Sequence, residues 1–98
     1  MIATLPTQEQ VDRIARDLAP DVVRIRVDIK PDWNENPAIY FRVTLSDEAS
    51  RRDPLRDVTG LVRAKLAEEL RLEDLDHIAY FRFRSNGEQA QLQDQAWE

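Results

Sequence analysis

The sequence predicts an α+β fold of two layers, with three strands in one sheet and two helices packed on one face of it. Two observations carry this prediction. Three runs, at 23–30, 39–45 and 77–84, alternate apolar and polar side chains with the period of two that is typical of half-buried strands. Two other runs place apolar side chains three and four residues apart, as in amphipathic helices. The order is α-β-β-α-β, and burying every apolar surface puts both helices on one face of the sheet and leaves the other face open.

Length and composition predict one small domain. The chain has 98 residues, of which 42% are hydrophobic, which suffices for a single core. We expect residues 1–86 to form the domain and 87–98, rich in Gln and poor in apolar residues, to be a mobile C-terminal tail or a short partner-dependent helix. No apolar run approaches the ~20 residues of a membrane span, and the start lacks a signal-peptide pattern, so we expect a cytoplasmic protein with no membrane partner.

The first half of the chain gives a helix and a hairpin. Thr7 and Gln10 have the spacing of a capping box, and the helix is expected over 7–19, ended by Pro20. In the first strand the side chains expected to face the core are Val23, Ile25, Val27 and Ile29. The second strand pairs with the first as an antiparallel hairpin across the polar loop 31–37. Trp33 in this loop either folds back over the sheet edge or anchors a partner.

The second half gives a helix and the third strand. Asp53 and Pro54 mark the helix start as N-cap and first helical residue. Its apolar stripe is expected to comprise Leu55, Val58, Leu61, Val62, Leu66 and Leu70. Gly60 within it indicates close packing against the sheet or a hinge. This helix must cross from the second strand to the third, with Ala79, Phe81 and Phe83 facing the core.

The open face carries the only candidate working surface in the sequence, which we call the basic face. Its expected charged members are Arg24, Arg26, Lys30, Arg42, Arg82 and Arg84 on the positive side and Asp28 on the negative. Tyr40 and Tyr80 lie among them, whereas the whole chain has a net charge of -5. Three interpretations stay open: a solvated face whose charges pair across strands, a protein interface, where Tyr and Arg are enriched, or a surface that stacks bases and pairs phosphates.

Recognisable catalytic or cofactor chemistry is missing from the sequence. There is no cysteine, one histidine (His77) and two glycines (Gly60 and Gly87), so thiol catalysis, Cys-ligated metals and phosphate-cradling loops are excluded. The acidic clusters lack the spacing of a calcium loop. We therefore expect no cofactor, no metal and no enzyme, with a small enzyme acting on an Arg-bound phosphate as the least favoured interpretation.

Several runs of the chain resemble known proteins. The runs that carry the resemblance are Pro20–Arg26, Asp32–Trp33, Pro37–Ile39, Phe41–Val43, Leu45–Asp53 and Tyr80–Ser85. They resemble a group of short bacterial proteins of unassigned function over about residues 5–86. Such proteins tend to be encoded beside small helical proteins of the HEPN type, which implies a toxin-antitoxin-like or other paired system. The run Leu66–Leu72 leading into the last strand is similar to ribosome-binding factor A at the level of the fold, but a net acidic chain departs from what rRNA binding requires.

Together these observations predict a non-enzymatic protein-interaction module, as the antitoxin-like half of a pair, with RNA binding by the same face as the alternative. The partner would present an acidic or strand-forming surface, or be a second copy that pairs through the open face or an edge strand. Trp97, a lone aromatic residue in a polar tail, is also expected to anchor the partner or the second copy. The residues expected to contact the partner are Arg24, Arg26, Tyr40, Arg42, Tyr80, Arg82, Arg84 and Trp97.

Overall fold

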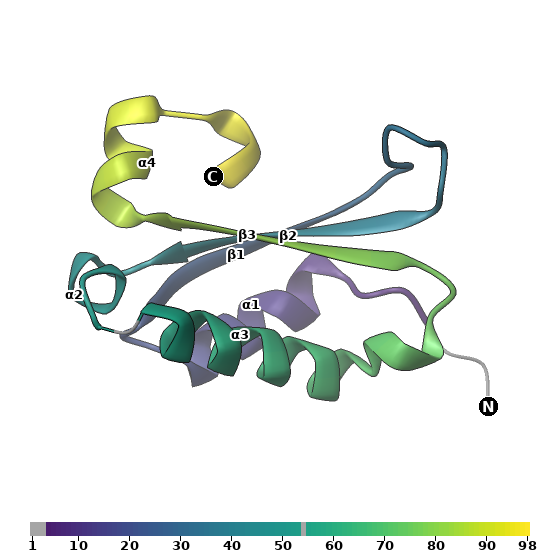
Figure 1. Ribbon diagram of the computed structural model, residues 1–98, viewed down its shortest axis with the longest axis horizontal. Helices are drawn as coiled ribbons and strands as arrows, with labels where there is room; N and C mark the ends of the chain where they lie inside the picture. The colour runs from purple at the N-terminus through teal and green to yellow at the C-terminus, as the bar shows by residue number, and fades with distance from the viewer. Residues whose placement is uncertain (1–3, 54) are drawn as a thin grey trace.

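The computed structural model describes residues 4–53 and 55–98 and confirms an α+β fold (Figure 1). The helices are α1 (Gln8–Asp17), α2 (Asp47–Ser50), α3 (Leu55–Leu70) and α4 (Asn86–Leu92), with the 3-10 turns η1 (Leu72–Asp74) and η2 (Gln95–Trp97). The strands are β1 (Val22–Ile29), β2 (Ala38–Leu45) and β3 (Ile78–Ser85). Helices α1 and α3 lie together on one face of the sheet, and α4 lies on the opposite side (Figure 1). Within the described residues, no helix is long and apolar enough to cross a membrane.

The sheet has the order β1-β2-β3, with β2 in the centre. β1 and β2 are antiparallel, which confirms the predicted hairpin, and β2 and β3 are parallel. Parallel neighbours need a crossover connection, and α3 provides it on the face that α1 also covers. The core fills the space between these two helices and the sheet. Its largest fully buried side chains include Phe41, Ile25, Ile39, Leu45, Leu66, Val11, Val43 and Val62.

A bulge at the start of β1 corrects one predicted core residue. Val22 pairs with Leu45 and Arg24 with Thr44, so Val23 is the extra residue between two consecutive pairs. Val22 is 3% exposed and Val23 is 43% exposed, the reverse of the simple alternation. A bulge of this kind shifts the side-chain alternation by one residue on one side of it. Because the shift precedes Arg24, the outward positions of the basic face are unaffected.

The helices also depart from prediction at single positions. The Thr7 capping box is present, and α1 spans Gln8–Asp17 within the predicted 7–19. In α3 the buried ridge runs at i+4 spacing through Val58, Val62 and Leu66, which leaves Leu61 at its margin and 61% exposed. Gly60 is also exposed, and a Cβ there would meet no atom within 4 Å, so the close-packing explanation is wrong. Pro54 and the side chain of Leu55 lie outside the described residues.

The C-terminal segment, residues 86–98, contains α4 and η2, in the region where the sequence predicted a mobile tail or a short partner-dependent helix. Ser85 accepts a hydrogen bond from the Glu88 N–H, and Glu88 accepts one from the Ser85 N–H, so a capping box begins α4 directly after β3. The Gly87 N–H donates to Asp47 Oδ1 at 2.8 Å, which ties α4 to α2. The chain then returns over the sheet, and Trp97 is only 5% exposed. The segment lacks apolar periodicity because one Trp and several polar contacts hold it in place.

Trp97→Ala and Trp33→Ala form a matched pair that tests this packing. Trp97 is 5% exposed and Trp33 is 72% exposed. We expect Trp97→Ala to lower the free energy of unfolding by about 3 kcal/mol, because it removes a large buried side chain. Trp33→Ala should change it by less than about 0.5 kcal/mol. Urea unfolding followed by circular dichroism measures both values. Equal, small effects at the two positions would show that the C-terminal segment is not packed on the sheet.

Candidate functional site

The basic face is organised in rows, because the register of the sheet places outward side chains side by side across the three strands. One row contains Arg24, Thr44 and Arg84. The next contains Arg26, Arg42 and Arg82, and we call it the arginine row. A third row contains Asp28, Tyr40 and Tyr80. Directly opposite side chains on paired strands lie about 5 Å apart at Cβ, so the members of each row are neighbours.

The arginine row is short of counter-charges. Arg42, the central member, has a side chain only 12% exposed and pairs with Asp28 at 3.5 Å. Asp28 is shared with Lys30, at 3.6 Å. The side chains of Arg26 and Arg82, both exposed residues, make no ion pair or hydrogen bond with any other residue that the structure describes. Like charges directly opposite on a sheet are destabilising, so this row favours the approach of an anion.

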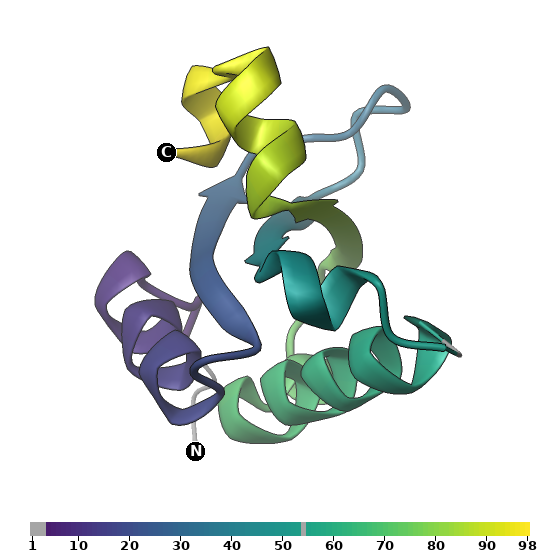
Figure 2. The same ribbon diagram turned by 90° about the vertical axis from the view of Figure 1, so that its left-hand side faces the viewer.

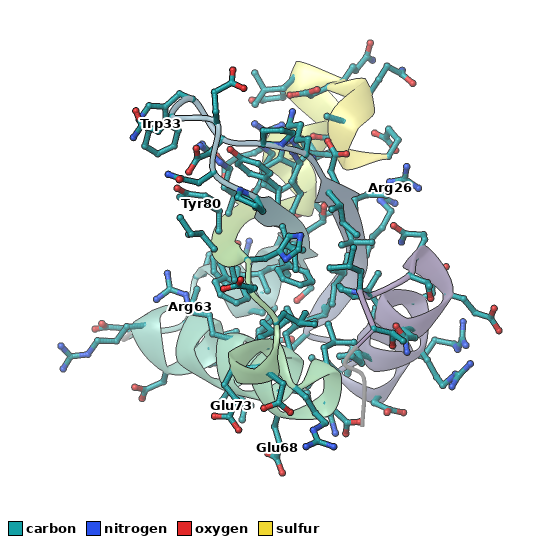
Figure 3. All side chains as sticks on the ribbon, turned by 90° about the vertical axis from the view of Figure 1, so that its right-hand side faces the viewer. Arg26, Trp33, Arg63, Glu68, Glu73 and Tyr80 are labelled. Carbon is teal, nitrogen blue, oxygen red and sulfur yellow. The ribbon has the colours of Figure 1, made fainter. Side chains whose placement is uncertain are left out.

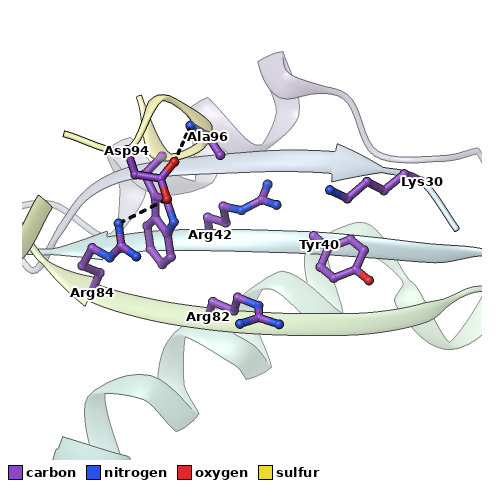
Figure 4. A pocket seen from close by; sticks show the side chains of 8 residues that line it. Lys30, Tyr40, Arg42, Arg82, Arg84, Asp94 and Ala96 are labelled. Carbon is purple, nitrogen blue, oxygen red and sulfur yellow. Dashed lines mark hydrogen bonds and ion pairs between the residues drawn. The ribbon is translucent and has the colours of Figure 1, made fainter. Parts of the chain in front are cut away.

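The C-terminal segment neutralises the row that contains Arg24 and Arg84. Arg24 Nε donates to the Trp97 carbonyl at 2.9 Å, and its guanidinium lies 3.5 Å from the Glu98 carboxylate. Arg84 stacks on the Trp97 ring, with 4.2 Å from its Cζ to the ring centroid, and lies 3.8 Å from the Asp94 carboxylate (Figure 4). An aromatic ring and two carboxylates therefore occupy this end of the basic face.

A buried glutamine connects the strand to this segment. Gln89 is 2% exposed, and its Oε1 accepts a hydrogen bond from Arg84 at 2.8 Å. Its Nε2 donates to the Asp94 carbonyl at 2.8 Å and to Glu98 Oε1 at 2.7 Å. The amide thus bonds β3 on one side and the end of the chain on the other. These contacts hold the C-terminal segment over one row and leave Arg26 and Arg82 of the arginine row exposed.

The two tyrosines form a stack that the loop 31–37 supports. Tyr40 and Tyr80 have ring centroids 5.0 Å apart and an angle of 16° between their planes. The Tyr80 hydroxyl donates to Asp32 Oδ2 at 2.9 Å, and Asp32 Oδ1 accepts from the backbone N–H groups of Asn34 and Asn36. Trp33 lies beside Tyr80, with 5.6 Å between centroids, at the outer end of the loop (Figure 3). The loop therefore fixes Tyr80 and presents an exposed indole next to the basic face.

These contacts shift two pKa values. Burial acts to raise the pKa of Asp32, but hydrogen bonds from Asn36, Tyr80 and Asn34 together outweigh it and hold the pKa below its ordinary value. The hydrogen bond to Asp32 raises the pKa of Tyr80, and both burial and the nearby carboxylate act in the same direction. Asp32 is therefore a carboxylate and Tyr80 a neutral donor across the physiological range.

A shallow groove of about 400 Å³ runs along the open part of the basic face (Figure 4). Its lining residues are Lys30, Tyr40, Arg42, Arg82, Arg84, Asp94, Ala96 and Trp97. The cations Lys30 and Arg42 lie 5.3 Å and 5.8 Å from the Tyr40 ring centroid, so they lie against this ring. The groove thus offers guanidinium and ammonium groups over an aromatic floor, which suits carboxylates or phosphates.

The structure brings five of the eight predicted contact residues into this groove: Tyr40, Arg42, Arg82, Arg84 and Trp97. Arg26 lies in the adjoining position of the arginine row, Arg24 binds the C-terminal segment, and Tyr80 supports the floor. Lys30 and Asp94 line the groove although they were not among the predicted contact residues. Lys30 follows the outward alternation of β1, so the pattern already indicated it, whereas no local signal indicated Asp94.

Other chemistry-bearing groups lie elsewhere or apart. Within residues 4–53 and 55–98, no three His, Asp or Glu side chains are placed to hold a metal ion. His77, the one histidine of the chain, does not line the groove, and its buried Nδ1 has no hydrogen-bond partner among these residues. Comparison of the chain with protein-family models, curated proteins and solved structures finds no match.

The Asp32 contacts predict a dependence of stability on pH. A carboxylate whose pKa is lower in the folded state stabilises the fold above its unfolded pKa of about 3.9, and this stabilisation is lost as the pH falls through the folded value. We expect Asp32→Asn to remove this part of the decrease in unfolding free energy below about pH 4. Tyr80→Phe should reduce it only in part, because the Asn34 and Asn36 hydrogen bonds remain.

Urea unfolding at a series of pH values measures this dependence, and ultraviolet titration follows the ionisation of the two tyrosines, Tyr40 and Tyr80. In Asp32→Asn the pKa of Tyr80 should return toward its ordinary value of about 10. An acid limb identical in the wild type and in Asp32→Asn would show that the carboxylate is not bound as described.

Proposed function

We propose that the protein is a non-enzymatic binding module whose basic face docks an acidic segment of a protein partner. The single observation that carries the proposal is the arginine row. Three arginines, Arg26, Arg42 and Arg82, occupy neighbouring positions across the three strands in a chain of net charge -5, and Asp28 is their one ion-pair partner among the described residues. A bound carboxylate would relieve the repulsion among them and form charge-assisted hydrogen bonds.

The C-terminal segment supports an acidic peptide as the ligand chemistry. In the neighbouring row, Glu98 and Asp94 lie against Arg24 and Arg84, and the Trp97 ring stacks on Arg84. The chain thus binds its own acidic, aromatic segment on the same type of surface. Trp33, 72% exposed beside the open part of the face, adds an anchor of the kind that is enriched in protein interfaces.

The alternative, RNA binding by the same face, is supported less well by the state of the aromatic rings. Sheets that bind single strands offer exposed rings on which bases stack. Tyr40 is 8% exposed and has Tyr80 against it and two cations nearby, and Trp97 is 5% exposed beneath Arg84. Trp33 is the one exposed ring at this face among the described residues. A protein partner is therefore favoured, and the paired-system resemblance adds a co-encoded small protein as the partner to try first.

Charge reversal of the unpaired arginines tests the proposal. Arg26→Glu with Arg82→Glu removes the two guanidinium groups that have no partner in the described chain, so no internal ion pair is lost. We expect this variant to bind a fluorescein-labelled peptide of glutamate and valine in shuffled order at least roughly tenfold more weakly than the wild type at low salt. Fluorescence anisotropy gives both affinities.

Arg16→Glu with Arg56→Glu is the matched control, since both residues are exposed on α1 and α3 and the net charge changes equally. It should bind the peptide like the wild type. If a labelled oligouridine binds with a steep salt dependence that Arg26→Glu with Arg82→Glu removes, while the peptide does not bind, the RNA function replaces the proposed one. If neither probe binds and no neighbouring gene product co-purifies on co-expression, the face is only solvated.

A further inference from the structure

The two edges of the sheet differ in whether they are blocked. An edge strand presents unpaired N–H and C=O groups that can template another strand. On β1, the side chain of Gln8 covers this edge: its Nε2 donates to the Ile25 carbonyl at 2.7 Å, and its Oε1 accepts from the Val27 N–H at 3.0 Å. This side chain, which α1 places beside the strand, imitates a neighbouring backbone. The β1 edge is thus closed at its middle.

The β3 edge is open. The Ile78 N–H donates to the Pro37 carbonyl at 3.0 Å, on the β2 side. Because alternate residues of a strand direct their backbone groups to opposite sides, the N–H and C=O groups of Ala79, Phe81 and Phe83 point away from β2. None of these groups has a hydrogen-bond partner in the part of the chain that the structure describes. In Figure 2, β3 runs along the outer side of the sheet above α3.

The side chains of β3 are incompletely covered as well. All eight residues of β3 are at least partly exposed, whereas seven of the eight residues of β2 are buried. On the core side, the Arg63 guanidinium lies 5.9 Å and 5.5 Å from the ring centroids of Phe81 and Phe83 (Figure 3 labels Arg63). A long cationic side chain thus lies against apolar rings that another strand would bury.

The positive charge of β3 favours pairing with an acidic strand at this edge. Arg82 and Arg84 occupy the outward positions of β3. In a second copy paired through β3, these arginines would lie opposite or diagonal to each other, which is unfavourable. A strand with glutamate or aspartate at alternate positions would instead place a carboxylate beside Arg82, which has no other partner among the described residues. Its intervening apolar side chains would pack on Phe81 and Phe83.

We propose that β3 is a strand-addition site for an extended segment that alternates acidic and apolar side chains, supplied by the protein partner. The inference rests on the proposed function and specifies how the partner is held: main-chain hydrogen bonds from Ala79, Phe81 and Phe83 supply the pairing, and Arg82 selects an acidic strand. The sheet would then have four strands, with Arg82 beside the carboxylates of the added strand.

The test compares two labelled peptides of the same composition, one with glutamate and valine in strict alternation and one shuffled. We expect the wild type to bind the alternating peptide about tenfold more tightly, because the alternating peptide alone can form a strand with one acidic face. Ala79→Pro should abolish this preference, since proline removes an outward N–H that an edge strand otherwise leaves free. Ala79→Val, which keeps the N–H, should retain the preference.

Amide exchange in the unsubstituted protein keeps the test independent of any folding defect in Ala79→Pro. On addition of the alternating peptide, exchange at Ala79, Phe81 and Phe83 should slow at least about tenfold. If both peptides bind equally, both are weakened by Arg26→Glu with Arg82→Glu, and these amides stay unprotected, strand addition fails and the proposed function stands. If neither peptide binds, the proposed function fails with it. A dimer in sedimentation that protects these amides without peptide would overturn the choice of an acidic strand.

Discussion

The register of the sheet aligns three arginines, Arg26, Arg42 and Arg82, and the repulsion among their charges is the main constraint on the basic face. The central strand β2 is buried along nearly its whole length, so its pairing with both neighbours is fixed by the core. If β2 shifted by one residue relative to its neighbouring strands, Phe41 and Val43 would move to the open face. The same register that buries these side chains aligns Arg26, Arg42 and Arg82 on the opposite face. The core thus sets the alignment, and negative charge is needed to reduce the repulsion that results.

Two sources of negative charge meet this need in different places. The C-terminal segment brings Asp94 and Glu98 to one end of the face, where Arg84 and Arg24 receive them. Among the described residues, Asp28 is the one carboxylate that pairs with the arginine row, and it is shared with Lys30. Asp94, Ala96 and Trp97 of the C-terminal segment line part of the groove (Figure 4). The proposed ligand therefore continues, from another molecule, a pattern of contacts that the chain begins with its own residues.

Much of this arrangement was predictable from the sequence, because alternation is a local signal. The alternation in the strands placed Arg42 and Arg82 on the open face. The order of the strands and helices predicted the hairpin and the crossover helix. The alternation failed at Val23, since a bulge changes it without changing the composition of the strand. Which rows form also depends on the register between strands, and no single strand encodes that.

The packing of the C-terminal segment is the feature that sequence patterns indicated least. Ser85 and Glu88 have the capping-box spacing that identified the first helix at Thr7, so the start of α4 was predictable. The return of the chain over the sheet after α4 was not predictable from the sequence. Trp97 is buried by contacts with Arg24 and Arg84, which are distant from it in the sequence, and a run rich in glutamine carries no period that would indicate such contacts.

The free energy of unfolding of Arg26→Gln with Arg82→Gln at low ionic strength tests the central claim most directly. If these arginines serve a ligand and repel Arg42 in the free protein, neutralising them should leave stability unchanged or raise it by a few tenths of a kcal/mol, with a smaller gain in high salt. A loss of about 1 kcal/mol or more would contradict the claim, because it would show that the two guanidinium groups stabilise the fold itself.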